Sequence, residues 1–159
     1  MNYYDETAEG YNELHGEEQL NKLKIIANEI KTTKETRLLD VGCGTGLSAK
    51  IFNCDITGID PAENLLEQCP FKIIKAKAES LPFKDNSFDA VIAVTSIHNF
   101  DDIKKGLKET KRVGKDHFAL TVLKKAQNAD QIIKKIKELF TIIKEINEDK
   151  DKIFILKLK

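Results

Sequence analysis

Hydrophobic and polar positions along the chain follow two periods. Short, mostly apolar runs of strand length alternate with longer segments in which apolar residues recur every three or four positions, as on the buried face of a helix. The runs that predict strands cover residues 37–41, 55–59, 71–78, 90–95 and 117–123. The segments that predict helices cover residues 18–31, 45–52, a short stretch after Pro61, 101–112 and 128–140. Strands that alternate with helices predict an α/β fold, with a parallel sheet between two layers of helices.

The last part of the chain departs from this alternation. Residues 142–146 and 153–158 both predict strands, and a short acidic turn around residues 148–151 joins them. A turn this short cannot carry a parallel crossover, so the two strands predict an antiparallel hairpin. We expect the 159 residues to form one domain, with N-terminal cap helices at 1–32, an α/β core at 37–125, and a helix plus hairpin at 128–159.

Composition and charge exclude some classes of protein. Lys and Arg together equal Asp and Glu at 26 each, so no net charge indicates a nucleic-acid partner, although a local basic face could hide within a neutral total. The three cysteines form no CxxC pair, so they predict buried thiols rather than a disulfide framework, and we expect no bound metal. The N-terminus has no apolar stretch and no run approaches the ~20 apolar residues of a membrane span, so we expect a cytoplasmic protein.

A glycine-rich loop after the first predicted strand is the main candidate for chemistry. The apolar run at 38–41 breaks into GCGTG at residues 42–46 before a helix restarts. Glycine permits positive φ angles and lets a ligand approach the backbone without meeting a Cβ, and ligands of open parallel sheets bind at this carboxyl edge. The spacing is GxGxG, and Leu47 stands where the GxGxxG fingerprint of a dinucleotide site has its third glycine. The loop is therefore a poor match for an NAD site.

Asp60 is the second candidate, because it ends the second predicted strand, 20 positions after Asp40. A carboxylate at this place can accept hydrogen bonds from both hydroxyls of a ribose, since it offers two acceptor oxygens. Taken alone, an Asp before a Pro is usually a turn or a helix cap. Beside the glycine loop, Asp60 indicates a nucleoside ligand rather than one particular cofactor.

Several stretches resemble the class I S-adenosylmethionine-dependent methyltransferases, in particular the type 11 group that includes enzymes of ubiquinone and menaquinone biosynthesis. LLDVGCGTG at 38–46 is similar to the family's first motif, and residues 78–83 with 85–89 resemble the segment after its third strand. Residues 3–12 resemble its N-terminal pattern, with Asn12 in place of the usual Asp. The resemblance implies a three-layer αβα sandwich around a Rossmann-like, seven-stranded, mostly parallel sheet of strand order 3-2-1-4-5-7-6, with an antiparallel C-terminal strand.

The resemblance also implies S-adenosylmethionine as the cofactor. Its ribose would lie on Asp60, its adenine beside Ala78 and Glu79, and its methionine end near Asp40 and Tyr11. The full set of expected cofactor contacts is Asp40, Gly42, Cys43, Gly44, Gly46, Asp60, Pro61, Ala78, Glu79, Thr95 and Tyr11.

The methyl acceptor would enter beside the stretch after the fourth strand, where Thr95, Ser96 and His98 lie. His98 is the candidate catalytic base, because an imidazole can take a proton from an acceptor. A His at this place can also simply pack against its loop. The sequence does not identify the acceptor, which could be a small molecule, a protein or an RNA.

Two other classes of protein stay open. An NAD(P)-binding domain would need a catalytic domain, and no residues remain to build one. A cofactor-binding subunit that is inactive or depends on a partner is the stronger alternative, because the short loops leave little to recognise an acceptor. The predicted edge strand at 72–77 could accept a strand from a small activator protein, such as the zinc-binding activator of some short archaeal methyltransferases, although its lysines could equally guard the edge against aggregation.

Overall fold

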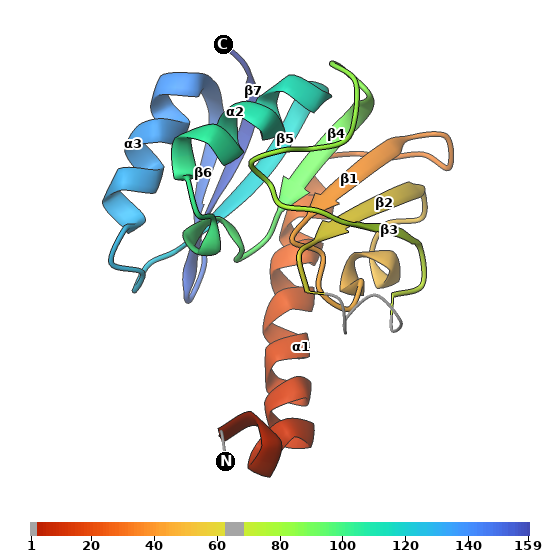
Figure 1. The fold of residues 1–159 in the computed structure, drawn as a ribbon, viewed down its shortest axis with the longest axis vertical. Coiled ribbons are helices and arrows are strands. Elements are labelled where there is room, and N and C mark those ends of the chain that lie inside the picture. Colours follow the sequence, from red (N-terminus) through yellow and green to blue (C-terminus); the bar gives the residue numbers. More distant parts are fainter. Residues whose placement is uncertain (1–2, 63–68) are drawn as a thin grey trace.

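Seven strands form one sheet in the computed structural model, which describes the backbone of residues 3–62 and 69–159 and the side chains of residues 15–62 and 69–159 (Figure 1). They lie in the order β3-β2-β1-β4-β5-β7-β6. Their bounds are β1 Arg37–Val41, β2 Asp55–Asp60, β3 Lys72–Lys75, β4 Phe88–Ala93, β5 Gly114–Leu123, β6 Phe140–Asn147 and β7 Asp151–Leu158. The first five strands in this order are parallel, whereas β7 is antiparallel to both β5 and β6. The predicted strand order and terminal hairpin are therefore confirmed.

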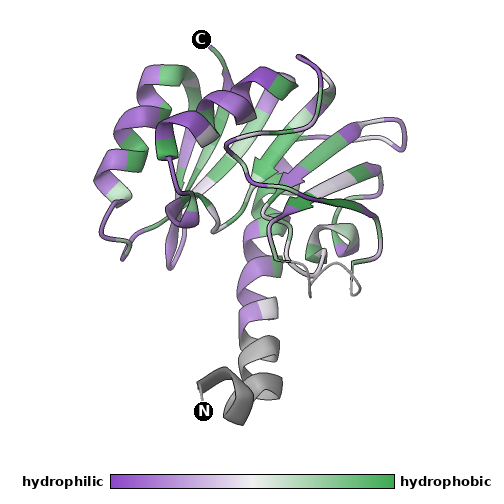
Figure 2. Ribbon diagram, viewed as in Figure 1, coloured by the Kyte–Doolittle hydropathy of each residue, from purple (hydrophilic) through white to green (hydrophobic). Residues whose placement is uncertain are grey.

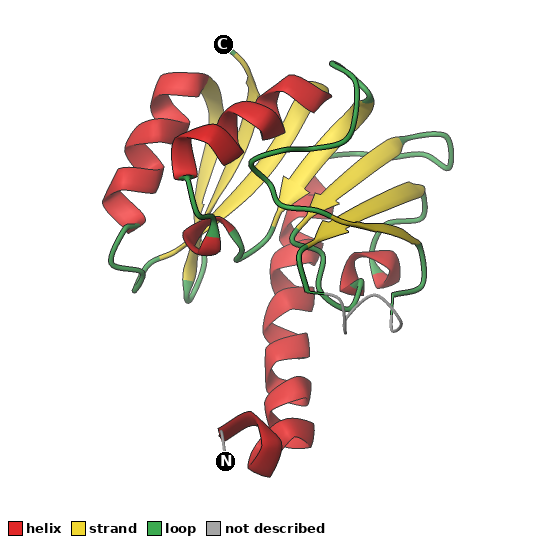
Figure 3. Ribbon diagram, viewed as in Figure 1, coloured by secondary structure: helices red, strands yellow, loops and turns green. Residues whose placement is uncertain are grey.

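Helices cover both faces of the sheet, as Figure 3 shows. α2 Ile103–Val113 and α3 Ala129–Leu139 lie side by side on one face, and the C-terminal part of α1 Tyr3–Glu29 packs on the other. Two short 3-10 helices, η1 Leu47–Lys50 and η3 Ile97–Asn99, follow β1 and β4. These layers confirm the predicted αβα sandwich.

Neighbouring residues of β1 bury their side chains on opposite faces of the sheet, because side chains alternate along a strand. Leu38 packs in a cluster with Ile26 of α1, whereas Leu39 packs in a second cluster with Leu107 of α2 and Ile132 of α3. All of these side chains are fully buried. Figure 2 shows the result, with hydrophobic strands between helices whose outer faces are hydrophilic.

The helix predicted after the glycines is shortened to η1. Gly46 precedes η1 with a φ of 82°, and this left-handed conformation prevents the helix from starting earlier. At the N-terminus, α1 starts at Tyr3, well before the start of the helix predicted at 18–31. The helix expected after Pro61 falls on residues 63–68, which lie outside the described residues.

β3 and β5 are among the strands whose length differs from the prediction. β3 is limited to Lys72–Lys75, because the chain after Lys75 turns toward the cleft described below. β5 begins at Gly114, directly after α2. A Cβ on Gly114 would lie 2.5 Å from the ring of Phe118, so a glycine lets the chain pass from helix to strand without a loop.

Candidate functional site

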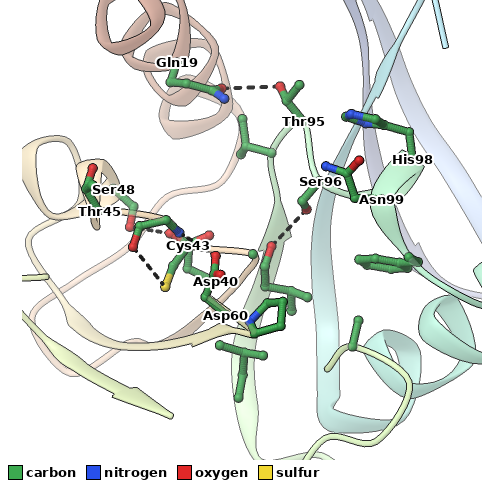
Figure 4. A pocket seen from close by; sticks show the side chains of 18 of the residues that line it. Gln19, Asp40, Cys43, Thr45, Ser48, Asp60, Thr95, Ser96, His98 and Asn99 are labelled. Atoms are coloured by element: carbon green, nitrogen blue, oxygen red, sulfur yellow. Dashed lines mark hydrogen bonds between the residues drawn. The ribbon is translucent and has the colours of Figure 1, made fainter. Parts of the chain in front are cut away.

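A cleft of about 1230 Å³ opens at the carboxyl ends of β1, β2 and β4. Its walls come from the glycine loop, the end of β2, residues 76–79, residues 94–101, and one face of α1. Figure 4 shows polar side chains from these elements around one space. Its size suits a cofactor-sized ligand, and its position is the one that open α/β sheets use for ligands.

The three glycines of the loop have left-handed backbone conformations, but their surroundings differ. Gly44 has a φ of 56°, and a Cβ there would meet none of the described atoms within 4 Å, so its backbone faces open space in the cleft. At Gly42, with a φ of 76°, a Cβ would lie 2.6 Å from the Cβ of Ser96. Gly46 packs against Cys69 and Pro70 instead and does not line the cleft, so its contact with a cofactor stays a prediction.

Asp60 shapes the loop before any ligand arrives. Its Oδ2 accepts the backbone N–H of Gly44 at 2.9 Å, and its Oδ1 accepts the N–H of Ala62 at 2.9 Å. The residue is 8% exposed and lines the cleft. Each carboxylate oxygen has a second lone pair, so Asp60 can hold the loop and still accept hydrogen bonds from the hydroxyl groups of a ligand.

Asp40 brings a second carboxylate to the cleft from the interior of β1. The Ser48 hydroxyl donates to its Oδ2 at 2.6 Å. Burial raises the pKa of Asp40 to about 6, the Ser48 hydrogen bond works in the opposite direction, and the nearby charge of Asp60 raises the pKa further. The cleft therefore holds two neighbouring acidic groups, an arrangement that favours a ligand carrying positive charge.

The segment after β3 lies where the sequence places it. Ala78 is buried, and both Ala78 and Glu79 line the cleft. The carboxylate of Glu79 accepts the backbone N–H of Asp102, just before α2, at 2.9 Å. One of its oxygens is thus committed to α2, and its expected contact with an adenine stays a prediction.

Phe83, Phe88 and Asp89 of the same region make structural contacts. Phe83 and Phe88 pack edge to face with ring centres 4.9 Å apart. Asp89 accepts the backbone N–H of Arg37 at 2.9 Å and pairs with Lys115, so it orders the starts of three neighbouring strands.

The stretch after β4 forms the opposite wall. Thr95, Ser96 and His98 all line the cleft, and Ser96 donates to the carbonyl of Val41 at 3.0 Å (Figure 4). The pKa of His98 is lowered from its ordinary value, mainly by burial. The charge of Asp151 opposes this shift, and the charge of Lys22 adds to it. A lowered pKa keeps the imidazole neutral near pH 7, which is the form that can accept a proton.

The other expected contacts divide into two groups. Cys43 and Pro61 line the cleft, and burial raises the pKa of the Cys43 thiol, so the thiol stays protonated and unreactive. The side chain of Tyr11 lies outside the described residues, so its role also stays a prediction.

Sequence analysis missed the contribution of α1. His15, Gln19 and Leu23 line the cleft, and Lys22 is buried beside them. A signal was present, because polar residues 15, 19 and 22 continue, at helical spacing, the buried stripe formed by residues 26 and 30.

The described residues lack two further kinds of feature. None of their helices combines the length and apolar character that a membrane span requires. Within the same part of the chain, no three His, Cys, Asp or Glu side chains are grouped as metal ligands would be.

The fold is that of a Rossmann-like α/β protein, with a cleft at the carboxyl edge of its sheet. The chain belongs to the methyltransferase domain family, whose profile matches residues 39–137.

Proteins similar to this chain include the following three. The uncharacterized protein MJ1252 of Methanocaldococcus jannaschii is 36% identical over an alignment of 128 residues, covering 76% of this chain and 50% of that protein. A demethylmenaquinone methyltransferase of Staphylococcus aureus is 33% identical over 131 residues, covering 74% of this chain and 54% of the enzyme. The chain spans about half the length of the curated relatives it matches.

The third is a solved structure of the complex between the Haloferax volcanii Trm112 methyltransferase activator and a second protein assigned as a methyltransferase. One of its chains matches with a TM-score of 0.78 at 11% identity, covering 99% of this chain and 98% of that one. At this identity the match shows a shared fold.

Proposed function

We propose that this chain binds S-adenosylmethionine in the cleft and transfers its methyl group to a nucleophile that enters beside His98. The observation that carries the proposal is the cradle formed by Gly44 and Asp60. The backbone of Gly44 faces open space, and the carboxylate that holds its N–H keeps lone pairs for ribose hydroxyls. Membership of the methyltransferase domain family supports this choice of cofactor.

The residues of the cleft fit this cofactor in charge as well as in shape. When bound, S-adenosylmethionine supplies an electrophilic methyl group on a positively charged sulfonium. Asp40 would favour that positive charge, and Asp60 would fix the ribose. Ala78 and Glu79 would border the adenine, and the glycine loop would leave room for the backbone approach.

His98 would take the proton of an acceptor that loses one on methylation. Its imidazole is neutral near pH 7, and it lies on the wall that Thr95 and Ser96 share. Orientation supplies much of the acceleration in such a displacement, because the sulfonium methyl is already activated and a well-placed nucleophile gains about 7–11 kcal/mol. The acceptor could be a small molecule, a protein or an RNA.

Calorimetric titration with S-adenosylhomocysteine and with NAD tests the cofactor assignment. We expect the first ligand to bind and the second not to bind. Asp60→Ala should weaken binding of S-adenosylhomocysteine by about tenfold or more, since a hydrogen bond to a charged group is worth about 1.5–3 kcal/mol. Asp55→Ala is the matched control, because Asp55 is exposed at the other end of the same strand. Equal affinity of Asp60→Ala and the wild type would refute the ribose assignment.

We also propose that the outer edge of β3, the first strand of the sheet, receives a small activator protein. β3 lies at the edge of the sheet, and Ile73 and Ile74 in it are half-buried. The similarity to a chain from a complex with Trm112 supports a partner of that type. Transfer of a labelled methyl group should be measured in cell extract with and without a purified Trm112-type activator. An activator that neither binds the chain nor stimulates the transfer would contradict this proposal.

A further inference from the structure

A buried ion pair joins the first helix to the last strand. Lys22 of α1 and Asp151 of β7 are 129 positions apart in the chain, yet Nζ and Oδ1 lie 3.1 Å apart, with side chains 3% and 0% exposed. Burying two charges carries a large desolvation penalty, and a well-packed apolar pair often gives equal or greater stability. The pair therefore calls for an explanation other than stability.

Both charged groups converge on Thr95, at the wall of the cleft. Thr95 donates its hydroxyl to Asp151 Oδ2 at 2.8 Å and accepts from Lys22 Nζ at 3.1 Å. Thr121 completes the network, since its hydroxyl donates to the same Oδ2 at 2.8 Å and accepts the backbone N–H of Thr95 at 2.7 Å. Gln19 Oε1 lies 3.3 Å from the Thr95 hydroxyl, as Figure 4 shows.

The network fixes a backbone conformation that a threonine rarely adopts. Thr95 has a φ of 51°, in the left-handed region, where β-branched residues are strained unless their surroundings hold them. The holding groups come from α1, β5 and β7, so three elements set the shape of the loop that leads to His98. The same contacts fix the position of Gln19, which lines the cleft.

The order of the strands shows which part of a ligand this wall would meet. Asp60 stands at the end of β2, Gly44 follows β1, and Thr95 follows β4 on the other side of β1. A ligand with its ribose on Asp60 and its adenine beside Ala78 extends across the glycine loop toward Thr95. The wall at Thr95 and Gln19 would therefore meet the end of the cofactor farthest from the adenine, which is its amino-acid end.

We propose that Lys22 and Asp151 are positioning residues, which shape the subsite for the amino-acid end of the adenosyl cofactor by fixing Thr95 and helix α1. This inference rests on the proposed function. It assigns a role to a pair of charges that touch neither the ribose nor the adenine.

The test compares S-adenosylhomocysteine with 5′-deoxy-5′-methylthioadenosine, which has the same adenosine and thioether but no amino-acid end. The variant Lys22→Met with Asp151→Asn removes both charges together, so no unpaired charge stays buried. We expect it to lose about tenfold or more in affinity for S-adenosylhomocysteine while its affinity for the shorter ligand changes less than about twofold.

The matched control removes an exposed pair between the same helix and the same terminal hairpin. Lys144 Nζ and Glu29 Oε1 lie 2.7 Å apart, between β6 and α1, with side chains 54% and 27% exposed. Glu29→Gln with Lys144→Met should leave both affinities unchanged. If the double variant of the buried pair does not fold, Thr121→Val tests the same network. It keeps both charges, their direct bonds to Thr95 and the side-chain shape, but removes the hydroxyl that accepts the Thr95 backbone N–H and donates to Asp151.

The outcomes separate this inference from the proposed function. A wild type that binds neither ligand contradicts both. The positioning role is overturned if the wild type binds the two ligands equally. It is also overturned if the Thr121→Val variant and a folded double variant lose both affinities in parallel. Either result leaves the proposed function standing. Selective loss of the ligand with the amino-acid end supports the inference.

Discussion

Asp40→Asn should stabilise the ligand-free protein at neutral pH, although it alters the cleft. Asp40 is 5% exposed, and its carboxylate accepts a hydrogen bond from Ser48. Burial raises its pKa from 3.8 to about 6, so the folded state holds the ionised form less readily than the unfolded state does. An asparagine keeps an acceptor oxygen for Ser48 and carries no charge.

The pH dependence gives the magnitude. For an acid whose pKa is raised on folding, the stabilisation is present below the unfolded pKa of 3.8 and is lost as the pH rises through the folded pKa of about 6. A pKa difference of this size corresponds to about 3 kcal/mol. The variant has no group to ionise there, so its free energy of unfolding should exceed that of the wild type by about 3 kcal/mol at pH 7 and by only about 0.5 kcal/mol near pH 4.

Urea denaturation of both proteins across this pH range measures the difference. Circular dichroism is the suitable signal, because the chain has no Trp. Asp89→Asn is the control of opposite sign, since the backbone N–H of Arg37 lowers the pKa of that carboxyl, so its contribution is present at neutral pH and lost in acid. An Asp40→Asn variant less stable than the wild type at pH 7, or a difference that does not change with pH, would refute the reasoning.

Two further predictions concern the walls of the cleft. Gly42→Ala forces a Cβ to within 2.6 Å of the Cβ of Ser96 at a φ of 76°, so we expect a loss of about 1–3 kcal/mol in stability together with loss of cofactor binding. Gly16→Ala, where a Cβ on helix α1 would meet open space, should instead stabilise the protein by up to about 1 kcal/mol. Equal unfolding midpoints for the two variants would contradict this. If His98 is the base, kcat should rise with pH through a pKa below 6.5 and stay level around neutrality, and His98→Asn should lower kcat while leaving the affinity for S-adenosylhomocysteine unchanged; an unaltered kcat in that variant would show that His98 only packs.

Much of the fold follows from local patterns. The strand at 37–41 and the hairpin around 148–151 are determined by short apolar runs and by the length of the turn between two strands. The helix predicted at 101–112 is present as α2, and Asp102 caps its start, because Asp102 Oδ1 accepts the backbone N–H of Lys105 at 3.1 Å. The length of the helix after the glycines was wrong, because an apolar pattern at helical spacing does not reveal that Gly46 needs a left-handed conformation.

The site was predictable where its residues are close in the chain. The loop at 42–46 and Asp60 were found because each directly follows a strand, and parallel strands bring such residues to one edge. The ion pair between Lys22 and Asp151 could not be found in this way. The pair depends on β7 lying next to β5 and on α1 packing on the face of the sheet opposite to α2 and α3. Together these features bring two residues 129 positions apart into contact.

The cofactor site proposed at Gly44 and Asp60 can be tested by a crystal structure with S-adenosylhomocysteine bound. We predict ribose hydroxyl oxygens at about 2.6–3.2 Å from the carboxylate of Asp60, with the ligand passing over Gly44 and its amino-acid end beside Thr95. A ligand bound elsewhere at saturating concentration, or a ribose that makes no contact with Asp60, would contradict it.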